Sequence, residues 1–426
     1  MKKLLRFFVV PALALLSRGV LRRYRPKIVM ITGSVGKTST KDAVAAVLST
    51  RFLVRKSEKS FNSEFGIPFT ILGVANPWTN PLAWFSIVKR ALALLILPNH
   101  YPTMLVLEVG ADRPGDLARM LRTVTPEAVV VTRLPEIPVH VEAYACPEEV
   151  RAEEFSPALY LEPGAPLVVS SDDPYALDAA KRVPARLITY GGAKESDVAV
   201  GEPDFIRSSE GRIDGMRASL IIEDASYELS VRGSVGATQV FPAAAAVAVG
   251  TAFGIPPADA LQALEAYEPP AGRGRLLRGK NGSIIIDDSY NSSPVAVEQA
   301  LTTLAAFPGA KRRIAVLGDM LELGRYSVEE HARVGALARK AADIVIAVGI
   351  RARAFLGENR EVGTVVAFDN AKQAAEALLY DVREGDVFLI KGSQSVRTER
   401  VTEALLADPS DVRLLVRQEK RWRAIA

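Results

Sequence analysis

The residues whose types and spacing most clearly suggest a chemical function form a glycine-rich turn at 31–41, which reads ITGSVGKTSTK. The preceding KIVM is apolar and β-branched, and the following DAVAAVLSTRF has apolar residues at helical spacing, so the turn is expected to join a strand to a helix. Gly33 and Gly36 would let backbone N–H groups close around an anion at the helix N-terminus. Lys37 would then reach the β- and γ-phosphates of a nucleotide, and Thr38 would offer its hydroxyl to Mg²⁺. The turn therefore predicts binding of ATP and Mg²⁺.

The match to the full phosphate-loop pattern is incomplete. That pattern has a glycine five positions before Gly36, where this sequence has Ile31. The turn is therefore a short variant, in which Ser39 adds a further hydroxyl beside the phosphates. A chance glycine-rich loop is the alternative, but the strand before the turn and the helix after it favour a phosphate site.

The composition indicates a folded protein of two or three domains. The chain has 426 residues, of which 49% are hydrophobic and 24% charged, values that are typical of globular proteins. Its single cysteine, Cys146, cannot form an internal disulfide, which fits the reducing cytoplasm. The net charge is +4, but residues 1–27 hold eight Lys or Arg and no acid, so the remainder carries 4 − 8 = −4. A mildly acidic body argues against nucleic acid as a partner.

Residues 1–26 are expected to form a basic, apolar leader helix. Its apolar run FFVVPALALL is ten residues long, whereas a membrane span needs about 20. A cleavable signal peptide has a similar outline, but the ATP site begins too soon after the run for export. Two interpretations stay open: an amphipathic anchor on the anionic inner face of the membrane, or a helix packed on the body. The apolar stretch at 81–97, interrupted by Lys89 and Arg90, belongs either to the same membrane-facing patch or to the core.

Residues 27–270 are expected to form a central ATP-binding α/β domain with a mostly parallel sheet. Unbroken apolar runs such as TMLVLEVG and AVVVTRL alternate with helical patterns, which is typical of a parallel sheet covered on both faces. Within residues 200–232, ASLIIEDASYELSVRG alternates instead and predicts an antiparallel hairpin attached to that sheet. A linker rich in proline and glycine follows at 267–275. The pattern then restarts and predicts a smaller, Rossmann-like α/β domain at 271–426.

Polar residues follow the expected strands, at the sheet edge where such domains bind ligands. Glu108 is either solvated or a Mg²⁺ ligand, and His140 is more readily structural than a ligand. In the second domain, Asp288 and Asn291 mark either a capped helix start or a site for ribose or base. Two domains whose strand ends face each other would form a cleft for a nucleotide and a second substrate, the architecture of a ligase more than of a motor.

Seven stretches, in the same order along residues 28–410, resemble the Mur ligase family. They are TGSVGKTSTK, SFNSEFGIPFTIL, LEVGADRPGDL, HVEAY, DDSYNSSP, VLGDMLELG and KGSQSVRTERV. The closest resemblance is to the branch that adds D-alanyl-D-alanine to a muramoyl tripeptide in peptidoglycan precursor synthesis. The resemblance implies an ATP-dependent ligase: ATP phosphorylates the acceptor's carboxylate, and an amine attacks the acyl phosphate to give an amide, ADP and phosphate.

The resemblance also implies roles for residues around the phosphates. Lys37 and Thr38 would hold the phosphates and one Mg²⁺, while Glu108 and His140 match the family's metal-binding carboxylate and histidine, which changes the interpretation of His140. Positioned cations contribute most of the stabilisation when negative charge accumulates at the transferring phosphoryl group. An arginine near the domain junction is expected to meet the phosphates.

The resemblance also implies residues for the arginine near the domain junction, for binding the nucleoside and for binding the second substrate. Either Arg273 or Arg275 matches the arginine, and the spacing does not decide between them. Asp288 matches the family's ribose-binding aspartate, and Asn291 would lie by the adenine. The stretches also indicate a set of substrate-binding residues, of which the last two would face the incoming amine: Asn62, Ser63, Asp319, Lys391 and Arg397.

Three departures from the family pattern affect these expectations. The family normally has a further domain before the phosphate loop to hold the UDP part of the acceptor, whereas about thirty residues precede it here; a lipid-linked or otherwise altered acceptor is one hypothesis. The lysine that the family carbamylates to bridge magnesium falls on Glu154, which could ligate Mg²⁺ directly and act in catalysis, unless the alignment is shifted or Glu154 is a surface residue. In GATQVFPAAAA, Thr238, Gln239 and Pro242 stand where relatives have nucleotide-contacting His and Asn residues.

Other functions stay open at this point. Within the same class, the chain could be a ligase acting on a polyglutamyl acceptor, although DDSYN and GDMLELG favour the muropeptide branch. From other classes, it could be a nucleotide-binding scaffold that has lost catalysis, or a simple P-loop NTPase or kinase, for which the second domain would go unexplained.

Overall fold

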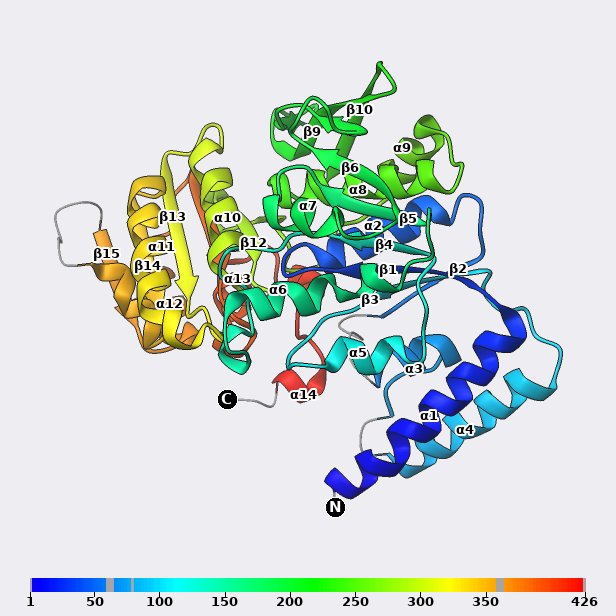
Figure 1. Ribbon diagram of the computed structural model, residues 1–426. Helices are drawn as coiled ribbons and strands as arrows, with labels where there is room; N and C mark the ends of the chain where they lie inside the picture. Colours follow the sequence, from blue (N-terminus) through cyan, green and yellow to red (C-terminus); the bar gives the residue numbers. More distant parts are fainter. Residues whose placement is uncertain (1, 59–64, 78–79, 358–363, 424–426) are drawn as a thin grey trace.

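Two sheets, formed one after the other along the chain, are the framework of the molecule (Figure 1). The computed structural model describes residues 2–58, 65–77, 80–357 and 364–423. The first sheet contains β1 (Lys27–Thr32), β2 (Val54–Lys56), β3 (Met104–Glu108), β4 (Ala128–Val131), β5 (Pro166–Ser170), β6 (Arg186–Gly191), β7 (Val198–Val200), β8 (Asp204–Arg207), β9 (Ile213–Ile222) and β10 (Ala225–Arg232). The second contains β11 (Arg275–Arg278), β12 (Ile284–Asp288), β13 (Arg312–Gly318), β14 (Ile344–Val348), β15 (Thr364–Phe368) and β16 (Asp386–Lys391).

The first sheet has the strand order β10-β9-β7-β6-β5-β4-β1-β3-β2, with β8 paired to β9. Neighbours from β2 to β7 are parallel, and β8, β9 and β10 pair antiparallel. The predicted mostly parallel sheet and its antiparallel hairpin are thus confirmed. Strand β1 lies between β3 and β4, with Ile31 opposite both Glu108 and Val130. This register brings the glycine-rich turn, Glu108 and the end of β4 to one sheet edge.

Helices cover both faces of the first sheet. One face carries α2 (Lys37–Leu48), α8 (Ala237–Ala252) and α9 (Pro257–Glu265). The other carries α1 (Lys2–Tyr24), α3 (Gly66–Leu72), α4 (Pro81–Ile96), α5 (Asp116–Leu121), α6 (Pro147–Phe155) and α7 (Pro174–Ala180). Successive residues of a strand point to opposite faces, so Val29 and Ile31 join one core while Ile28 and Met30 join the other. Burial on both faces explains the unbroken apolar strands.

The second sheet has the order β11-β12-β16-β13-β14-β15, in which only β11 is antiparallel to its neighbour. One face packs against α10 (Pro294–Ala306) and α11 (Ser327–Ala341), and the other against α12 (Ala371–Leu378) and α13 (Glu399–Leu405); α14 (Lys420–Arg423) follows later. Short 3-10 helices complete the chain: η1 (Val141–Ala143), η2 (Ser156–Tyr160), η3 (Lys280–Gly282), η4 (Gly324–Tyr326), η5 (Arg351–Leu356), η6 (Gln394–Val396) and η7 (Pro409–Leu414). This arrangement confirms the predicted second α/β unit.

The two sheets share part of one apolar core. Helices α8 and α10 are in contact, and the ring of Phe205 on β8 packs edge-on against Phe307 at 5.4 Å between centroids. The packing holds the carboxyl ends of the two sheets toward each other.

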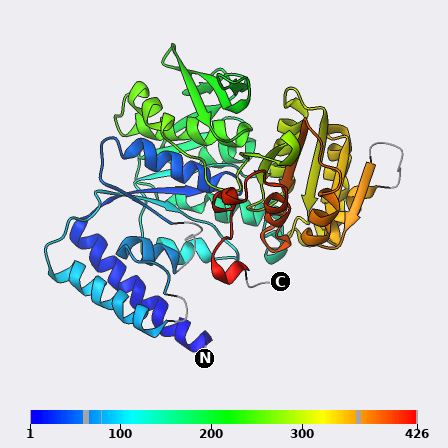
Figure 2. The same cartoon turned by 180° about the vertical axis from the view of Figure 1, so that it is seen from behind.

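The leader forms a helix that packs on the body. The Tyr24 hydroxyl donates to the Leu94 carbonyl at 2.8 Å, and the Tyr24 ring stacks on Tyr101 at 4.5 Å. Helices α1 and α4 lie side by side at the far end of the molecule from the second sheet (Figures 1 and 2). Among the described helices, none is both long enough and apolar enough to cross a membrane.

A buried ion pair should measurably stabilise the second sheet. Asp386 is fully buried and accepts hydrogen bonds from Arg312 Nε at 2.8 Å, Arg312 Nη2 at 2.7 Å and the Arg383 N–H at 2.8 Å. Charge-assisted bonds of this kind weaken when the carboxylate becomes an amide, so Asp386→Asn should lower the free energy of unfolding by about 2 kcal/mol. Urea denaturation measures this. The exposed neighbour, Glu384→Gln, is the control, and equal stability of the two variants would contradict the role of the pair.

Candidate active site

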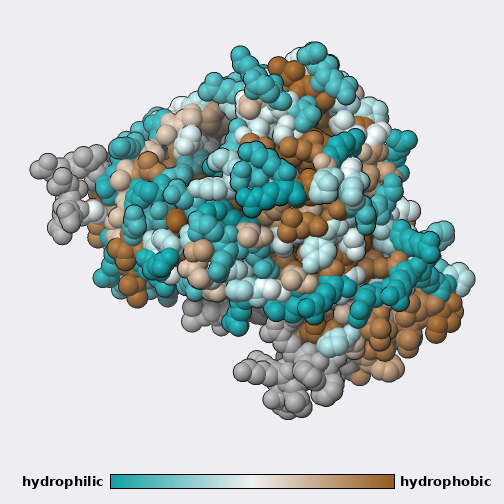
Figure 3. All heavy atoms as spheres, in the orientation of Figure 1, coloured by the Kyte–Doolittle hydropathy of each residue, from teal (hydrophilic) through white to brown (hydrophobic). Residues whose placement is uncertain are grey.

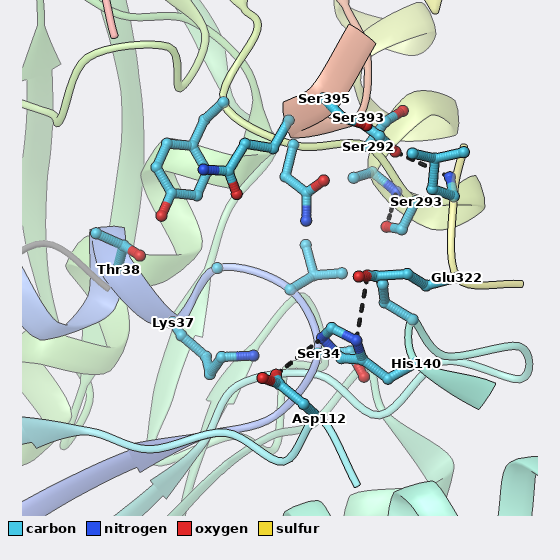
Figure 4. A pocket seen from close by; sticks show the side chains of 18 of the residues that line it. Ser34, Lys37, Thr38, Asp112, His140, Ser292, Ser293, Glu322, Ser393 and Ser395 are labelled. Atoms are coloured by element: carbon cyan, nitrogen blue, oxygen red, sulfur yellow. Dashed lines mark hydrogen bonds and ion pairs between the residues drawn. The ribbon is translucent and has the colours of Figure 1, made fainter. Parts of the chain in front are cut away.

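The facing edges of the two sheets enclose a cavity of about 760 Å³, within the usual size of small-molecule sites. In Figure 4, Lys37 and Thr38 lie on one side and Ser292, Ser293, Ser393 and Ser395 on the other. The lining also includes Ser34, Gly36, Glu108, Asp112, His140, Glu154, Arg273, Tyr290, Asn291, Glu322, Lys391 and Trp422. The cavity thus collects most of the predicted site residues from segments far apart in sequence.

The glycine-rich turn forms an anion-binding cradle at the start of α2. Gly33 has φ 109°, and a Cβ there would lie 2.5 Å from Thr132 Oγ1, so only glycine fits. Gly36 is the N-cap of α2 with φ 87°. Lys37 folds back so that its ammonium donates to the Gly33 carbonyl. Free N–H groups at the N-terminus of this helix and the adjacent ammonium provide the positive potential that a phosphate needs.

Thr38 and Glu108 place a hydroxyl and a carboxylate side by side next to the turn. Thr38 Oγ1 donates to Glu108 Oε1 at 3.1 Å, and both side chains are buried. Glu108 Oε2 has no hydrogen-bond partner among the described groups, and Lys41 Nζ is 3.8 Å from it. A buried carboxylate oxygen without a donor, next to a hydroxyl, is the donor chemistry that Mg²⁺ prefers. The fully buried Lys41 was not anticipated from the sequence.

Glu154 on α6 is buried at the wall of the cavity, with 2% of its surface exposed. Its carboxylate accepts from Ser34 Oγ and lies 4.0 Å from Lys37 Nζ. Its backbone carbonyl accepts from Thr32 Oγ1 at 2.6 Å, which ties α6 to β1. Burial raises the pKa of Glu154 above its ordinary value, against the opposing effects of Lys37 and Ser34. The alternative that Glu154 is a surface residue is therefore excluded.

His140 bridges the two units. Its Nε2 is 3.6 Å from Asp112 Oδ1 and its Nδ1 is 3.1 Å from Glu322 Oε2 (Figure 4). His140 itself has φ 68°, a left-handed conformation that turns its side chain into the cleft at the start of η1. Thr38, Glu108, His140 and Glu154 all line the cavity, but no three of the described His, Cys, Asp or Glu groups lie close enough together to hold a metal ion.

The structure distinguishes the two candidate arginines. Arg273 Nη2 donates to Thr38 Oγ1 at 3.3 Å, and its guanidinium stacks on the Tyr290 ring at 4.1 Å. Arg275 instead belongs to β11, where its backbone lies opposite Asp287 of β12 and forms a β-bridge with Ser234, and it is not part of the cavity lining. Arg273 is therefore the cation from the linker that reaches the phosphate loop.

The predicted nucleoside residues lie together at the end of β12. Lys391 Nζ donates to Asp288 Oδ2 at 2.7 Å and to the Asn291 carbonyl at 3.0 Å. Asn291 and Lys391 line the cavity, while Asp288 is mostly buried behind them. The N-cap of α10 is Ser293, whose Oγ accepts from the Ala296 N–H at 3.4 Å. Asp288 is thus not needed for helix capping, and its place beside the cavity fits a ligand role.

Besides Gly33, Arg275 and Asp288, three other predicted residues lie outside the cavity lining. The carbonyl of the buried Ser39 accepts from the Tyr267 hydroxyl at 3.2 Å. Asp319 accepts from the Ala352 N–H at 2.7 Å and so stabilises a loop. Arg397 pairs with Glu399 and donates to the Trp422 carbonyl at 2.8 Å, because a buried acid recruits it into the core. Two further predictions, Asn62 and Ser63, fall outside the described residues.

Sequence reasoning missed several residues of the cavity wall. Asp112 and Glu322 lie within the quoted stretches LEVGADRPGDL and VLGDMLELG, so their polar character after a strand was the available signal. Trp422 near the end of the chain carried no such signal. It comes to the cavity because the segment before it folds back, with Arg417 donating to the Tyr290 and Ser289 carbonyls at 3.0 and 2.5 Å.

The substituted stretch GATQVFP lies beside this site. Gln239 Nε2 donates to the Arg273 carbonyl at 2.8 Å, so Gln239 fixes the backbone of the linker arginine. Thr238 and Pro242 line a separate hollow of about 60 Å³ that also touches Gly36. The residues at these positions thus support the linker and the loop.

Family models match both parts of this arrangement. The Mur ligase middle domain matches residues 31–250, and the Mur ligase glutamate ligase domain matches residues 272–394. The chain belongs to the Mur ligase family, as its motifs predicted.

Within the family, the chain is similar to several ligases that add D-alanyl-D-alanine. The UDP-N-acetylmuramoyl-tripeptide--D-alanyl-D-alanine ligase of Bacillus subtilis is 28% identical over 93% of this chain and 80% of its own length. The enzyme of the same name from Mycobacterium tuberculosis is 31% identical over 89% of this chain and 73% of its own. The solved MurF ligase of Thermotoga maritima in complex with ADP aligns with a TM-score of 0.75 and 26% identity, covering 93% of this chain and 83% of that one.

Asp287, next to Asp288 in β12, carries a buried carboxyl group. Asp287 is fully buried, with Thr402 Oγ1 donating to its Oδ1 at 3.1 Å and its Oδ2 unpaired among the described groups. Burial raises the pKa of Asp287 to about 6, against the hydrogen bond from Thr402 that lowers it. The folded protein therefore binds a proton that the unfolded chain, with a carboxyl pKa of about 3.9, releases more readily.

Asp287 should give the fold a measurable pH dependence. Its raised pKa contributes stability that is fully present below about pH 4 and is lost as the pH rises through about 6. Asp287→Asn needs no proton, so its stability relative to the wild type should increase by roughly 2–3 kcal/mol between pH 4 and pH 7. Urea denaturation across this range measures the change. The exposed Glu403→Gln on the same side of the domain is the control, and a pH-independent difference for Asp287→Asn would contradict the shift.

Proposed function

We propose that this protein is an ATP-dependent amide-bond ligase that joins D-alanyl-D-alanine to the terminal carboxylate of a muramoyl peptide in peptidoglycan precursor synthesis. The observation that carries the proposal is the Thr38–Glu108 pair and Lys37 at a phosphate loop that faces a second α/β unit across one cavity. A simple NTPase would not need a second α/β unit on the other side of the cavity. The names of the relatives and the ADP complex of the Thermotoga maritima neighbour support this substrate class and ATP.

The phosphate loop would bind the ATP phosphates through the N-terminal N–H groups of α2 and the Lys37 ammonium. Thr38 and Glu108, with Glu154 and His140 nearby, are the groups that would hold Mg²⁺. When bound, Mg²⁺ neutralises charge on the phosphates and so favours phosphoryl transfer. Arg273 would bring a second positive charge to the same phosphates from the linker, and its stacking on Tyr290 restricts its guanidinium to that direction.

Glu154 would position the cations around the transferring phosphoryl group. Its carboxylate accepts from Ser34 and faces Lys37, so it orients one hydroxyl and one ammonium of the phosphate loop. Such preorganisation avoids reorientation when charge develops in the transition state. A direct contact of Glu154 with Mg²⁺ would preserve the charge that a carbamylated lysine supplies in the family.

The second unit would bind the nucleoside and the incoming amine. Asp288 and Asn291 would contact ribose and adenine, with Lys391 holding both in place. Lys391 and the Ser393 hydroxyl would face the amine substrate, whose nitrogen attacks the acyl phosphate and releases phosphate. Closure of the cleft through the His140–Glu322 contact would exclude water, which otherwise hydrolyses that intermediate.

We also infer that the enzyme works in the cytoplasm, peripherally at the inner face of the membrane. The eight cations and absence of acids in residues 1–27 support this location. A lipid-linked acceptor fits the same location, and a polyglutamyl acceptor is the alternative within the ligase class.

The substrate dependence of phosphate release tests the function. Purified protein with Mg-ATP, UDP-muramoyl tripeptide and D-alanyl-D-alanine should release phosphate only when both substrates are present, and mass spectrometry should find the pentapeptide product. Each substrate is omitted in turn as a control. Release without either substrate would indicate a simple NTPase. No release by protein that binds ATP would contradict this acceptor, and lipid-linked and polyglutamyl acceptors would then be compared.

Replacing Glu154 tests its role in the reaction. Glu154→Gln keeps the size of the side chain but removes its charge, so the rate of phosphate release should fall by about 100-fold or more. Steady-state kinetics measure kcat and KM, and thermal denaturation shows whether the variant is folded. Glu162→Gln, an exposed carboxylate after η2, should retain full activity. If Glu154→Gln turns over near the wild-type rate, the Glu154 carboxylate has no role in the reaction.

A further inference from the structure

Helix α4 has two apolar faces, and the described residues cover only one of them. Ile87, Ala91 and Leu94 are buried in the core beneath the helix. Phe85 and Ile96, on the opposite side, are 72% and 69% exposed. A helix that is apolar on all sides is normally buried or lies in a membrane. The second face of α4 therefore lacks a partner among the described residues.

Exposed apolar side chains continue from α4 onto α1. The exposed set, here named the outer α1–α4 face, consists of Leu15, Leu82, Phe85, Val88, Leu92, Ile96 and Leu97. In Figure 3 the brown area at the lower right of the molecule lies over α4. Contiguous exposed apolar surfaces of this kind mark interaction sites in soluble proteins.

The charge around this face has one sign. Residues 1–41 and 65–107, which include α1, α3 and α4, contain no Asp or Glu, although the whole chain has 49. Arg18 and Arg22 on α1 are exposed, as is Lys89 on α4. Lys89 lies four residues after Phe85 and three before Leu92, so it shares their side of the helix. A long lysine can keep its ammonium at a charged boundary while its stem lies among apolar groups.

Contacts between α1 and α4 hold the two helices in an orientation that leaves the outer α1–α4 face exposed. Arg23 of α1 donates to the Leu95 carbonyl and, at 3.2 Å, to the Leu97 carbonyl at the end of α4. Gly19 lets α1 approach Leu95 closely, since a Cβ there would lie 3.0 Å from that side chain. These contacts satisfy the last carbonyls of α4 and fix its rotation.

We propose that the outer α1–α4 face docks on an anionic lipid surface, with its apolar side chains at the level of the acyl chains and its cations at the headgroups. Amphipathic helices with this combination bind in the plane of the interface. A second copy of the chain fits less well, because two faces that both carry cations and no acids repel each other. The inference rests on the proposed cytoplasmic location and is independent of the ligase chemistry.

Docking through this face would leave the reaction site accessible. The α1–α4 pair lies at the opposite end of the molecule from the second sheet in both views (Figures 1 and 2). The second unit would thus remain free of the lipid while the first is held.

Vesicle binding tests the proposal. The full chain is sedimented with vesicles of phosphatidylcholine containing about one third phosphatidylglycerol, and with vesicles of phosphatidylcholine alone. The wild type should bind the anionic vesicles at least about tenfold more tightly than the neutral ones, and Phe85→Ser/Ile96→Ser should lose at least about tenfold of that binding. Lys89→Glu should weaken binding to the anionic vesicles only. Val328→Ser/Ile350→Ser, two equally exposed apolar residues in the second unit, is the matched control and should bind like the wild type.

Other readouts distinguish failure of the surface from failure of the protein. Thermal denaturation and ATP binding without vesicles should be unchanged in every variant, so a loss of vesicle binding reports on the face. Absence of wild-type binding to anionic vesicles would overturn the proposal. Light scattering that finds a dimer in the wild type and a monomer in Phe85→Ser/Ile96→Ser, without vesicle binding, would assign the face to self-association. Because vesicle binding is measured without acceptor, a negative ligase assay does not affect this result.

Discussion

The hydrogen bond from Arg273 to Thr38 connects the linker to the phosphate loop, and the His140–Glu322 contact joins the two units. Two further contacts keep the linker and the two units in these positions. The Phe205–Phe307 contact joins the two cores, and Gln239 fixes the backbone of Arg273. A site assembled from both units can bring a nucleotide and a second substrate together, which neither sheet edge could do alone.

Several charges around the phosphate loop are buried, which is costly unless each is paired. Lys41 lies near Asp42 and Glu108, and Glu154 lies near Lys37 and Ser34. The pairing explains why the cluster is tolerated in the folded protein. It also leaves one oxygen of Glu108 without a hydrogen-bond partner among the described groups.

Sequence patterns predicted the framework well because burial on both faces makes parallel strands continuously apolar. The phosphate loop and Glu108 could be located for the same reason, since the loop follows β1 and Glu108 is the last residue of β3. Arg273 and Arg275 could not be separated, because the sequence does not mark where the linker ends; β11 begins at Arg275, so Arg273 stays in the linker. Arg397 was expected at the substrate, yet Glu399 draws it into the core. Trp422 reaches the cavity through long-range packing that no local pattern encodes.

The position of Trp422 gives the enzyme an intrinsic fluorophore at the wall of the cavity between the two sheets. The chain has three tryptophans, and Trp422 lies at the cavity wall with its ring 5.6 Å from the Arg397 guanidinium. Indole emission depends on the polarity and charge around the ring. Ligand entry or movement of the C-terminal segment would change that environment, so occupancy of the cleft can be followed optically without attaching a label.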